Sequence, residues 1–317
     1  MSPPENPSAP NRSAFGQGGV RSSPSTLLVL GDSLAFHGPE RAEPADHPRI
    51  WPQVAAAALG GRVELVAGIG WTTRHAWHAL THDPRVWAAM PRIDALVLGV
   101  GGMDALPSPL PTAVRELIPV LRPAVLRGRV RAGYLRAQPL LSRAFAALPG
   151  GGPVALPPRL TVAYLERCRA AVTALRPGIP VVAMLPSVHR AAVYGGVHAG
   201  RAAAERATRT WADANGVRVL DAPTLVAGHV LGGHGNPDGM HWGWEAHRRV
   251  GETLAELLRG ELAARPGVPV LDGLPRVGPS VRAAQAASGV EDGLSLPGSC
   301  DHGPTVVEPP GPTAVRP

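Results

Sequence analysis

The sequence contains no lysine, so all 31 basic residues are arginine, and together with 24 acidic residues they give a formal net charge of +7. This excess favours an anionic partner. Nucleic acid is disfavoured, because only 4% of the residues are aromatic and the sequence shows neither a basic helix interleaved with aromatic residues nor a known binding module. A phosphate-bearing small molecule or an acidic sugar fits the charge as well.

Cysteine is nearly absent, and the two present, Cys168 and Cys300, cannot form a disulfide framework. Cys168 lies in a helical pattern and is predicted to be a packed thiol. No apolar run is long enough to span a bilayer, and residues 1–25 lack the apolar core of a signal peptide. These absences predict a cytoplasmic protein without a membrane partner. They give no prediction of oligomeric state.

Short, continuously apolar runs alternate along the chain with amphipathic stretches of helical period. This order predicts one doubly wound parallel sheet of α/β class. The expected strands are the run from Thr26 to a Gly-Asp-Ser sequence, then 62–67, 94–100, 181–185 and 217–221. The expected helices are 51–59, 72–80, 84–90, 160–175, 200–215, 223–231 and 244–262.

Three segments break this rhythm. Residues 1–25 and 266–317 are rich in Pro, Gly and Ser without period, so we expect a disordered leader and a disordered tail around a catalytic domain at 26–265. Residues 105–160 begin with spaced prolines, contain a short helical stretch at 112–118, and continue into an arginine-dense region. We expect a helical insertion over the carboxyl edge of the sheet, covering the active site. A solvated pair of surface helices is the alternative.

The first candidate for chemistry is Ser33, in Gly31-Asp32-Ser33-Leu34 at the end of the first expected strand. In open α/β sheets the reacting groups lie just outside the carboxyl ends of the strands. Gly31 allows a sharp turn there. The alternative is that Asp32 or Ser33 only caps the next helix.

Asp238 and His241, near the other end of the chain, supply the partners that a serine nucleophile needs. Residues three apart on a turn share a face, so the Asp238 carboxylate can orient the imidazole of His241, which can then accept the proton of Ser33. The chain order Ser, Asp, His, without a Gly-x-Ser-x-Gly sequence, differs from the nucleophile elbow of α/β-hydrolases.

A metal site is the competing interpretation of the same region. Two more histidines, His229 and His234, precede Asp238 and His241, and imidazole with carboxylate suits zinc. The spacing from His241 to His247 does not match the paired histidines of a zinc-protease helix. We therefore expect no metal and no other cofactor.

Four blocks together resemble the SGNH (GDSL) hydrolase superfamily. They are Gly31-Asp32-Ser33-Leu34, Gly68-Ile69-Gly70-Trp71, Gly101-Gly102-Met103-Asp104 and Asp238-Gly239-Met240-His241. The resemblance implies a flavodoxin-like, three-layer α/β/α fold. It also implies a Ser33–His241–Asp238 triad and an oxyanion hole made by backbone N–H groups of Ser33 and of Gly70 or Trp71.

The third block departs from the superfamily pattern, because Met103 stands where an asparagine usually adds an oxyanion donor, and methionine has no N–H to donate. Asp104 keeps the final acid of that block and is expected to bond backbone around the active loop. Trp71 and Trp242 flank the two halves of the site and are candidates to line an acyl pocket, with core packing as the alternative.

The chain is also similar to a narrower family, the actinobacterial diglucosylglycerate octanoyltransferases. The similar stretches are 45–52, 68–72, 101–108, 175–180, 185–189, 239–242 and 245–247. Gly-Gly-Met-Asp looks like that family's own third block. The resemblance implies transfer of an octanoyl group from octanoyl-coenzyme A to diglucosylglycerate, a step of methylglucose lipopolysaccharide synthesis.

Two other functions remain open at the level of sequence. An esterase or thioesterase has the same triad and differs only in letting water intercept the acyl-enzyme. A non-catalytic carbohydrate-binding relative is suggested by Met103.

Overall fold

The computed structural model describes residues 24–110, 114, 117–148 and 150–263. Within this part of the chain, five strands form one parallel sheet in the order β2-β1-β3-β4-β5. The strands are β1 (Thr26–Gly31), β2 (Arg62–Ala67), β3 (Ala95–Gly99), β4 (Val181–Met184) and β5 (Arg218–Leu220). This is the flavodoxin-like order, with its switch point between β1 and β3. The predicted fold class is confirmed.

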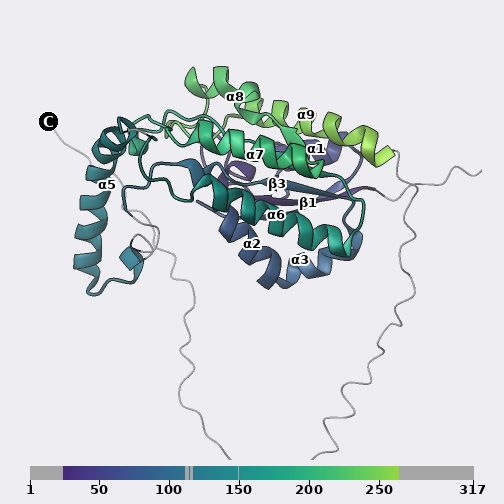
Figure 1. Cartoon of the computed structure of the whole chain (residues 1–317). Coiled ribbons are helices and arrows are strands. Elements are labelled where there is room, and N and C mark those ends of the chain that lie inside the picture. The colour runs from purple at the N-terminus through teal and green to yellow at the C-terminus, as the bar shows by residue number, and fades with distance from the viewer. Residues whose placement is uncertain (1–23, 111–113, 115–116, 149, 264–317) are drawn as a thin grey trace, which may run out of the picture. The chain divides into compact units, whose positions relative to one another are not determined.

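Alternate residues of the central strands feed two separate cores. Leu28 and Leu30 of β1 pack in a core with helices α2 (Thr73–His82), α3 (Pro84–Ala89), α6 (Pro158–Leu175) and α7 (Arg201–Asn215). Leu27 and Val29 pack on the opposite face with α1 (Trp51–Ala58), α8 (Ala222–Leu231) and α9 (Trp244–Ala263). Figure 1 shows α1, α8 and α9 on one side of the sheet and α2, α3 and α6 on the other. Since both faces are covered, the central strands β1, β3 and β4 are buried and almost entirely apolar, whereas the edge strands β2 and β5 contain charged residues.

The expected helices are present with ends shifted by at most two residues, and local chemistry explains the ends. The Asp83 side chain accepts a hydrogen bond of 2.9 Å from the Arg85 N–H and caps α3. Gly216 ends α7 with a left-handed φ of 62°, which glycine adopts without a Cβ clash. Cys168 is buried on α6, where burial raises the pKa of its thiol to about 12, so the prediction of a packed thiol is confirmed.

The segment at 105–160 contains one long helix, α5 (Ala124–Ala146), which belongs to neither helix layer and lies beside one end of the sheet (Figure 1). Most of α5 is exposed. Its second half contacts the 3₁₀ turn η5 (Ala192–Tyr194), and Arg143 Nε donates a hydrogen bond of 2.9 Å to the Gly195 carbonyl. The lid role expected for this segment stays a prediction. The expected helix at 112–118 lies mainly outside the described residues.

Further short 3₁₀ turns connect these elements: η1 (Ser33–Ala35), η2 (Met90–Arg92), η3 (Met103–Ala105) and η4 (Ile118–Val120). The expected leader and tail lie outside the described residues, apart from positions 24 and 25. The domain bounds therefore stay a prediction.

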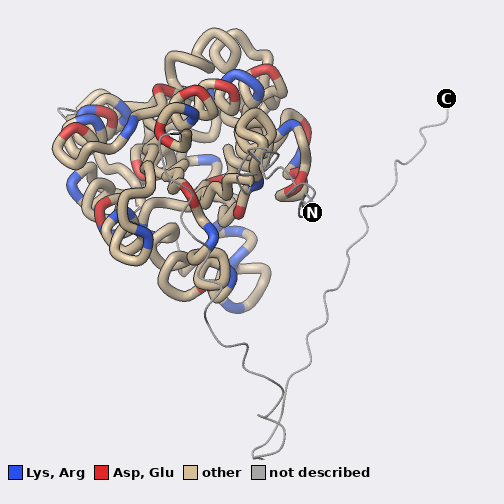
Figure 2. The backbone as a smooth tube through the Cα atoms, turned by 90° about the vertical axis from the view of Figure 1, so that its right-hand side faces the viewer, with Lys and Arg blue, Asp and Glu red and all other residues tan. Residues whose placement is uncertain are grey.

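Basic and acidic positions are interspersed over the face of the molecule turned to the viewer in Figure 2. Many of them pair along one helix: on α9, Glu245 accepts hydrogen bonds from Arg248 at 2.7 Å and from Arg249 at 2.8 Å. Such exposed pairs contribute little to stability. No helix among the described residues combines the length and the apolar character needed to cross a membrane.

Candidate active site

Ser33 sits where the sequence places it, directly beyond the carboxyl end of β1. The chain turns there because Gly31 lacks a side chain: a Cβ at that position would lie 2.6 Å from the Cβ of Ala35. Asp32 caps the turn η1 by accepting a hydrogen bond of 2.9 Å from the Leu34 N–H. Asp32 therefore caps the turn, as the alternative interpretation expects, while Ser33 faces a different partner and its chemical role stays a prediction.

That partner is His241. Its Nε2 lies 2.9 Å from the Ser33 Oγ, and its Nδ1 lies 2.5 Å from Oδ2 of Asp238. Because a carboxylate can only accept, Nδ1 carries the ring proton and Nε2 is free to accept the hydroxyl proton of Ser33. The three residues are therefore arranged as a serine–histidine–aspartate relay, although 205 positions or more separate Ser33 from the other two.

The loop that carries Asp238 and His241 is held by the same carboxylate. Its Oδ1 accepts hydrogen bonds from the backbone N–H groups of Met240, at 2.8 Å, and His241, at 3.0 Å. Gly239 has a φ of 75°, and its carbonyl accepts a hydrogen bond of 2.8 Å from the Arg190 N–H. One oxygen of Asp238 thus shapes the loop while the other orients the imidazole.

The protonation states suit a general base. Burial lowers the pKa of His241 below its ordinary value by more than the hydrogen bond to Asp238 raises it, so the ring is neutral at neutral pH. Burial acts to raise the pKa of Asp238, but hydrogen bonds from Met240 and His241 bring it below its ordinary value. Asp238 is therefore ionised where His241 is neutral.

A second histidine, His37, packs on the ring of His241, and no pattern in the sequence indicates this contact. The two imidazoles are stacked with centroids 3.9 Å apart and planes inclined by 20°. The carbonyl of His37 accepts a hydrogen bond of 3.1 Å from Nε2 of the buried His247, whose Nδ1 accepts one from the Trp51 N–H. His37 is thereby fixed against the face of the His241 ring.

The glycine block that follows β2 supplies the candidate oxyanion hole. Gly70 has a φ of 70°, and a Cβ added to it would lie 3.9 Å from the terminal methyl of Met103. The two blocks expected to form the hole therefore meet, with a thioether in place of an amide. The Trp71 N–H donates to the Gly68 carbonyl at 3.3 Å within a turn, so Gly70 is the better donor candidate of the two.

Three other candidate residues, Asp104, Trp242 and Trp71, pack in or against the interior of the fold. The carboxylate of Asp104 is fully buried and accepts hydrogen bonds from the Thr73 backbone N–H, the Thr73 hydroxyl and the Thr161 hydroxyl at 3.0, 2.6 and 2.9 Å. Trp242 is fully buried in the core on the α9 side, where its indole N–H donates to Ser187 Oγ at 3.3 Å. Trp71 packs against the opposite core. Trp242 therefore packs in the core, which is the alternative interpretation, and a role of either tryptophan in an acyl pocket stays a prediction.

The histidines weighed as metal ligands are engaged differently. Nε2 of His229 accepts a hydrogen bond of 3.1 Å from the Gly243 N–H, and its ring centroid is 5.9 Å from that of His234. Among the residues that the structure describes, no three His, Cys, Asp or Glu side chains are placed to hold a metal ion.

A small pocket of about 20 Å³ opens beside Ser33. Its lining is mostly apolar and includes Met103, Leu106, Ser187, His189 and His198. His189 and His198 belong to the segment between β4 and α7, which contains no periodic pattern in the sequence. The sequence therefore offers no signal that these two histidines lie beside Ser33.

Burial also raises the pKa of Asp32 to about 7. The nearby Asp104 raises this pKa further, whereas the hydrogen bond from the Leu34 N–H lowers it. A carboxyl of ordinary pKa 3.8 ionises in the unfolded chain while Asp32 stays protonated in the folded one. The unfolded state then binds fewer protons, so stability falls as pH rises from about 4 to about 7.

We expect Asp32→Asn, which retains an oxygen for the Leu34 N–H, to remove this loss. The free energy of unfolding of the variant minus that of the parent should be about 3 kcal/mol larger at pH 8 than at pH 5. Urea unfolding at the two pH values measures it. Asp213→Asn, at an exposed position of α7, is the control and should show a constant difference. An equal difference for Asp32→Asn at both pH values would mean that Asp32 is ionised throughout.

Comparison with known proteins shows which family the chain belongs to. Residues 29–249 match the GDSL-like Lipase/Acylhydrolase family, and because this is more than half of the chain, the chain belongs to that family. The predicted superfamily is confirmed. A relative from Mycolicibacterium hassiacum, named diglucosylglycerate octanoyltransferase, is 52% identical over 247 residues, which are 77% of this chain and 97% of the relative.

A second relative of the same name, from Mycobacterium tuberculosis, is 49% identical over 243 residues, covering 77% of this chain and 94% of the relative. Among solved structures, a lipase/acylhydrolase from Enterococcus faecalis is similar with a TM-score of 0.47 and 13% identity, over 74% of this chain and 96% of that one.

Proposed function

We propose that this chain is a serine acyltransferase that moves an octanoyl group from octanoyl-coenzyme A to diglucosylglycerate. The observation that carries the proposal is about 50% identity, over 77% of this chain and at least 94% of each relative, to two proteins named for that transfer. The relay of Ser33, His241 and Asp238 supports it, because acyl transfer through serine needs such a base and orienter. A cytoplasmic setting, where acyl-coenzyme A is available, is part of the proposal.

In the first half of the reaction, Ser33 Oγ attacks the thioester carbonyl while His241 Nε2 takes its proton. The N–H groups of Ser33 and Gly70 stabilise the tetrahedral oxyanion. The carbon–sulfur bond then breaks, and the thiol of coenzyme A leaves with the proton from His241. The product is octanoyl-Ser33.

In the second half, a hydroxyl of the sugar gives its proton to His241 Nε2 and attacks the octanoyl ester. The bond to Ser33 Oγ breaks, and Oγ recovers the proton from the imidazole. The stacked ring of His37 limits rotation of His241 through both halves, so the same nitrogen faces both reacting oxygens.

The second candidate function is hydrolysis, which the family description also covers. The relay alone does not separate the two, because water can replace the sugar. The experiment is to incubate the protein with octanoyl-coenzyme A, with and without diglucosylglycerate, and to follow both free thiol and octanoylated sugar.

We expect a stoichiometric burst of coenzyme A without the sugar, and sustained turnover with acylated sugar only when it is present. Sustained release that is equally fast without the sugar, and no acylated sugar, would reject transfer in favour of hydrolysis.

A further inference from the structure

Two histidines beside Ser33, the buried His189 and the half-buried His198, have ring nitrogens without a hydrogen-bond partner in the described part of the chain. They are Nε2 of His189 and both ring nitrogens of His198. Both side chains line the pocket next to the nucleophile, and their ring centroids are 4.5 Å apart. Buried polar atoms without partners are uncommon in folded proteins, and each one calls for an explanation.

The unpartnered nitrogens of the two rings offer two donors and one acceptor. Nδ1 of His189 accepts a hydrogen bond of 3.2 Å from the Ala191 N–H, so its Nε2 carries the proton and is a donor. His198 in its neutral form offers one donor and one acceptor. Burial lowers the pKa of His189 to about 4, and burial together with His189 and Arg201 lowers that of His198 to about 3, so both rings are neutral at pH 7.

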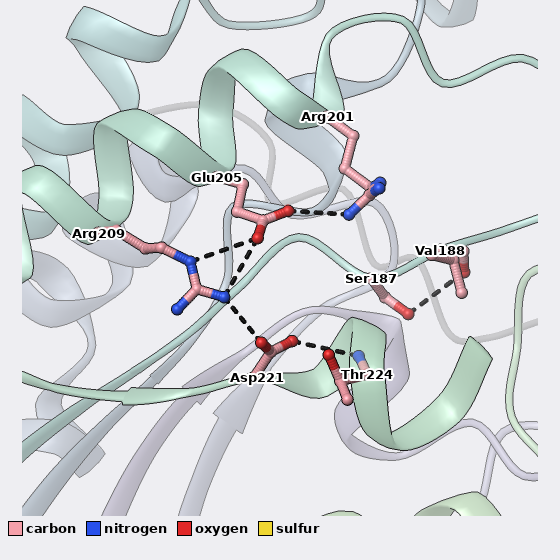
Figure 3. Close-up of polar contacts among 7 residues, drawn as sticks. All are labelled: Ser187, Val188, Arg201, Glu205, Arg209, Asp221 and Thr224. Atoms are coloured by element: carbon pink, nitrogen blue, oxygen red, sulfur yellow. Dashed lines mark hydrogen bonds and ion pairs between the residues drawn. The ribbon is translucent and has the colours of Figure 1, made fainter.

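The charged groups around the pair argue against an anionic ligand. Arg201, which begins α7 close after His198, donates to Glu205 at 2.9 Å. Arg209 is paired with Glu205 and with Asp221, as Figure 3 shows. These two arginines of α7 are therefore paired with carboxylates. Two neutral imidazoles are themselves a poor site for a carboxylate or phosphate.

An alkyl chain is also a poor occupant, because it would leave the three ring nitrogens without partners and still out of water. The hydroxyl of Ser187 already has hydrogen-bond partners, since it donates to the Val188 carbonyl at 3.2 Å and accepts from Trp242. Two donors and one acceptor within an otherwise apolar lining match a sugar, which presents hydroxyls that both donate and accept beside C–H faces.

We propose that the pocket lined by His189 and His198 binds neutral hydroxyl groups of the sugar acceptor and so determines acceptor specificity. This inference rests on the proposed function and adds the place where the acceptor is held. It assigns the octanoyl chain and the phosphates of coenzyme A to other surfaces.

The test separates the two halves of the reaction. His189→Phe and His198→Phe keep a flat ring but remove the polar atoms. We expect each to leave the burst of coenzyme A from octanoyl-coenzyme A unchanged and to raise the KM for diglucosylglycerate by about tenfold, as expected for the loss of one or two hydrogen bonds. His198→Asn, which keeps a donor and an acceptor, should recover part of the loss.

His82→Phe is the matched control, because His82 is an exposed histidine on α2. Melting temperatures identify any variant that fails to fold, and His198→Asn then carries the test. An unchanged KM for the sugar, with a changed preference among butyryl-, octanoyl- and dodecanoyl-coenzyme A, would overturn the inference and place the acyl chain in the pocket.

A binding measurement keeps this inference separate from the proposed function. Saturation-transfer NMR of diglucosylglycerate with Ser33→Ala requires no turnover. If the sugar binds to Ser33→Ala and not to Ser33→Ala with His198→Phe, the pocket assignment stands even where no transfer is detected. Equal binding to both would reject the assignment while leaving the acyltransferase activity untouched.

Discussion

Ser33→Ala is expected to abolish transfer, with a fall in kcat on the order of a million-fold, because no other group can carry the acyl chain between the two half-reactions. The geometry behind this expectation is the 2.9 Å contact of Ser33 Oγ with His241 Nε2. The variant should show neither a burst of coenzyme A nor an octanoyl adduct in the intact mass of the protein.

Ser142→Ala is the control, since it removes a buried hydroxyl from α5, outside the relay. It should transfer octanoyl groups at the parental rate. Melting temperatures of both variants should stay close to that of the parent. Sugar-dependent transfer by Ser33→Ala at even one per cent of the parental rate would show that Ser33 is not the nucleophile.

Asp238→Asn should lower kcat by about ten thousand-fold while leaving the loop in place. The amide oxygen can still accept from the backbone N–H groups of Met240 and His241, which now donate to Oδ1. The amide nitrogen, however, donates to Nδ1 of the imidazole. The ring proton then moves to Nε2 and points at Ser33, so the imidazole can no longer act as a base.

Asp83→Asn is a matched control, because Asp83 also holds a turn through its carboxylate but lies on the surface before α3. Its kcat should equal that of the parent. Equal rates for Asp238→Asn and the parent would remove Asp238 from the proposed relay, and a large fall in melting temperature would mean that its loop role dominates.

The sheet and the relay could be predicted because their signals are local. The apolar run of β1 indicates a buried strand, and its Gly-Asp-Ser ending places Ser33 at the carboxyl edge. Asp238 and His241 lie three positions apart, which is enough to put them on one face of a turn. Only their meeting with Ser33 needed the fold, and the parallel sheet order supplies it.

The rest of the site depends on contacts that have no local signal. Nothing near His37 in the sequence indicates that its ring stacks on His241, since the contact joins two loops about 200 positions apart. His189 and His198 lie in a connection without periodicity. Trp71 and Trp242 looked alike in the sequence, and only the fold shows that Trp242 is fully buried in one core while Trp71 is partly buried against the other.

Each of the two carboxylate oxygens of Asp238 has its own partners. One atom ties two amides of the loop and its neighbour holds the imidazole, so a longer glutamate could not satisfy both at the same backbone position. A change in the length of this side chain would therefore disturb the loop and the placement of the imidazole together, whereas a change of the outer oxygen alone affects only the imidazole.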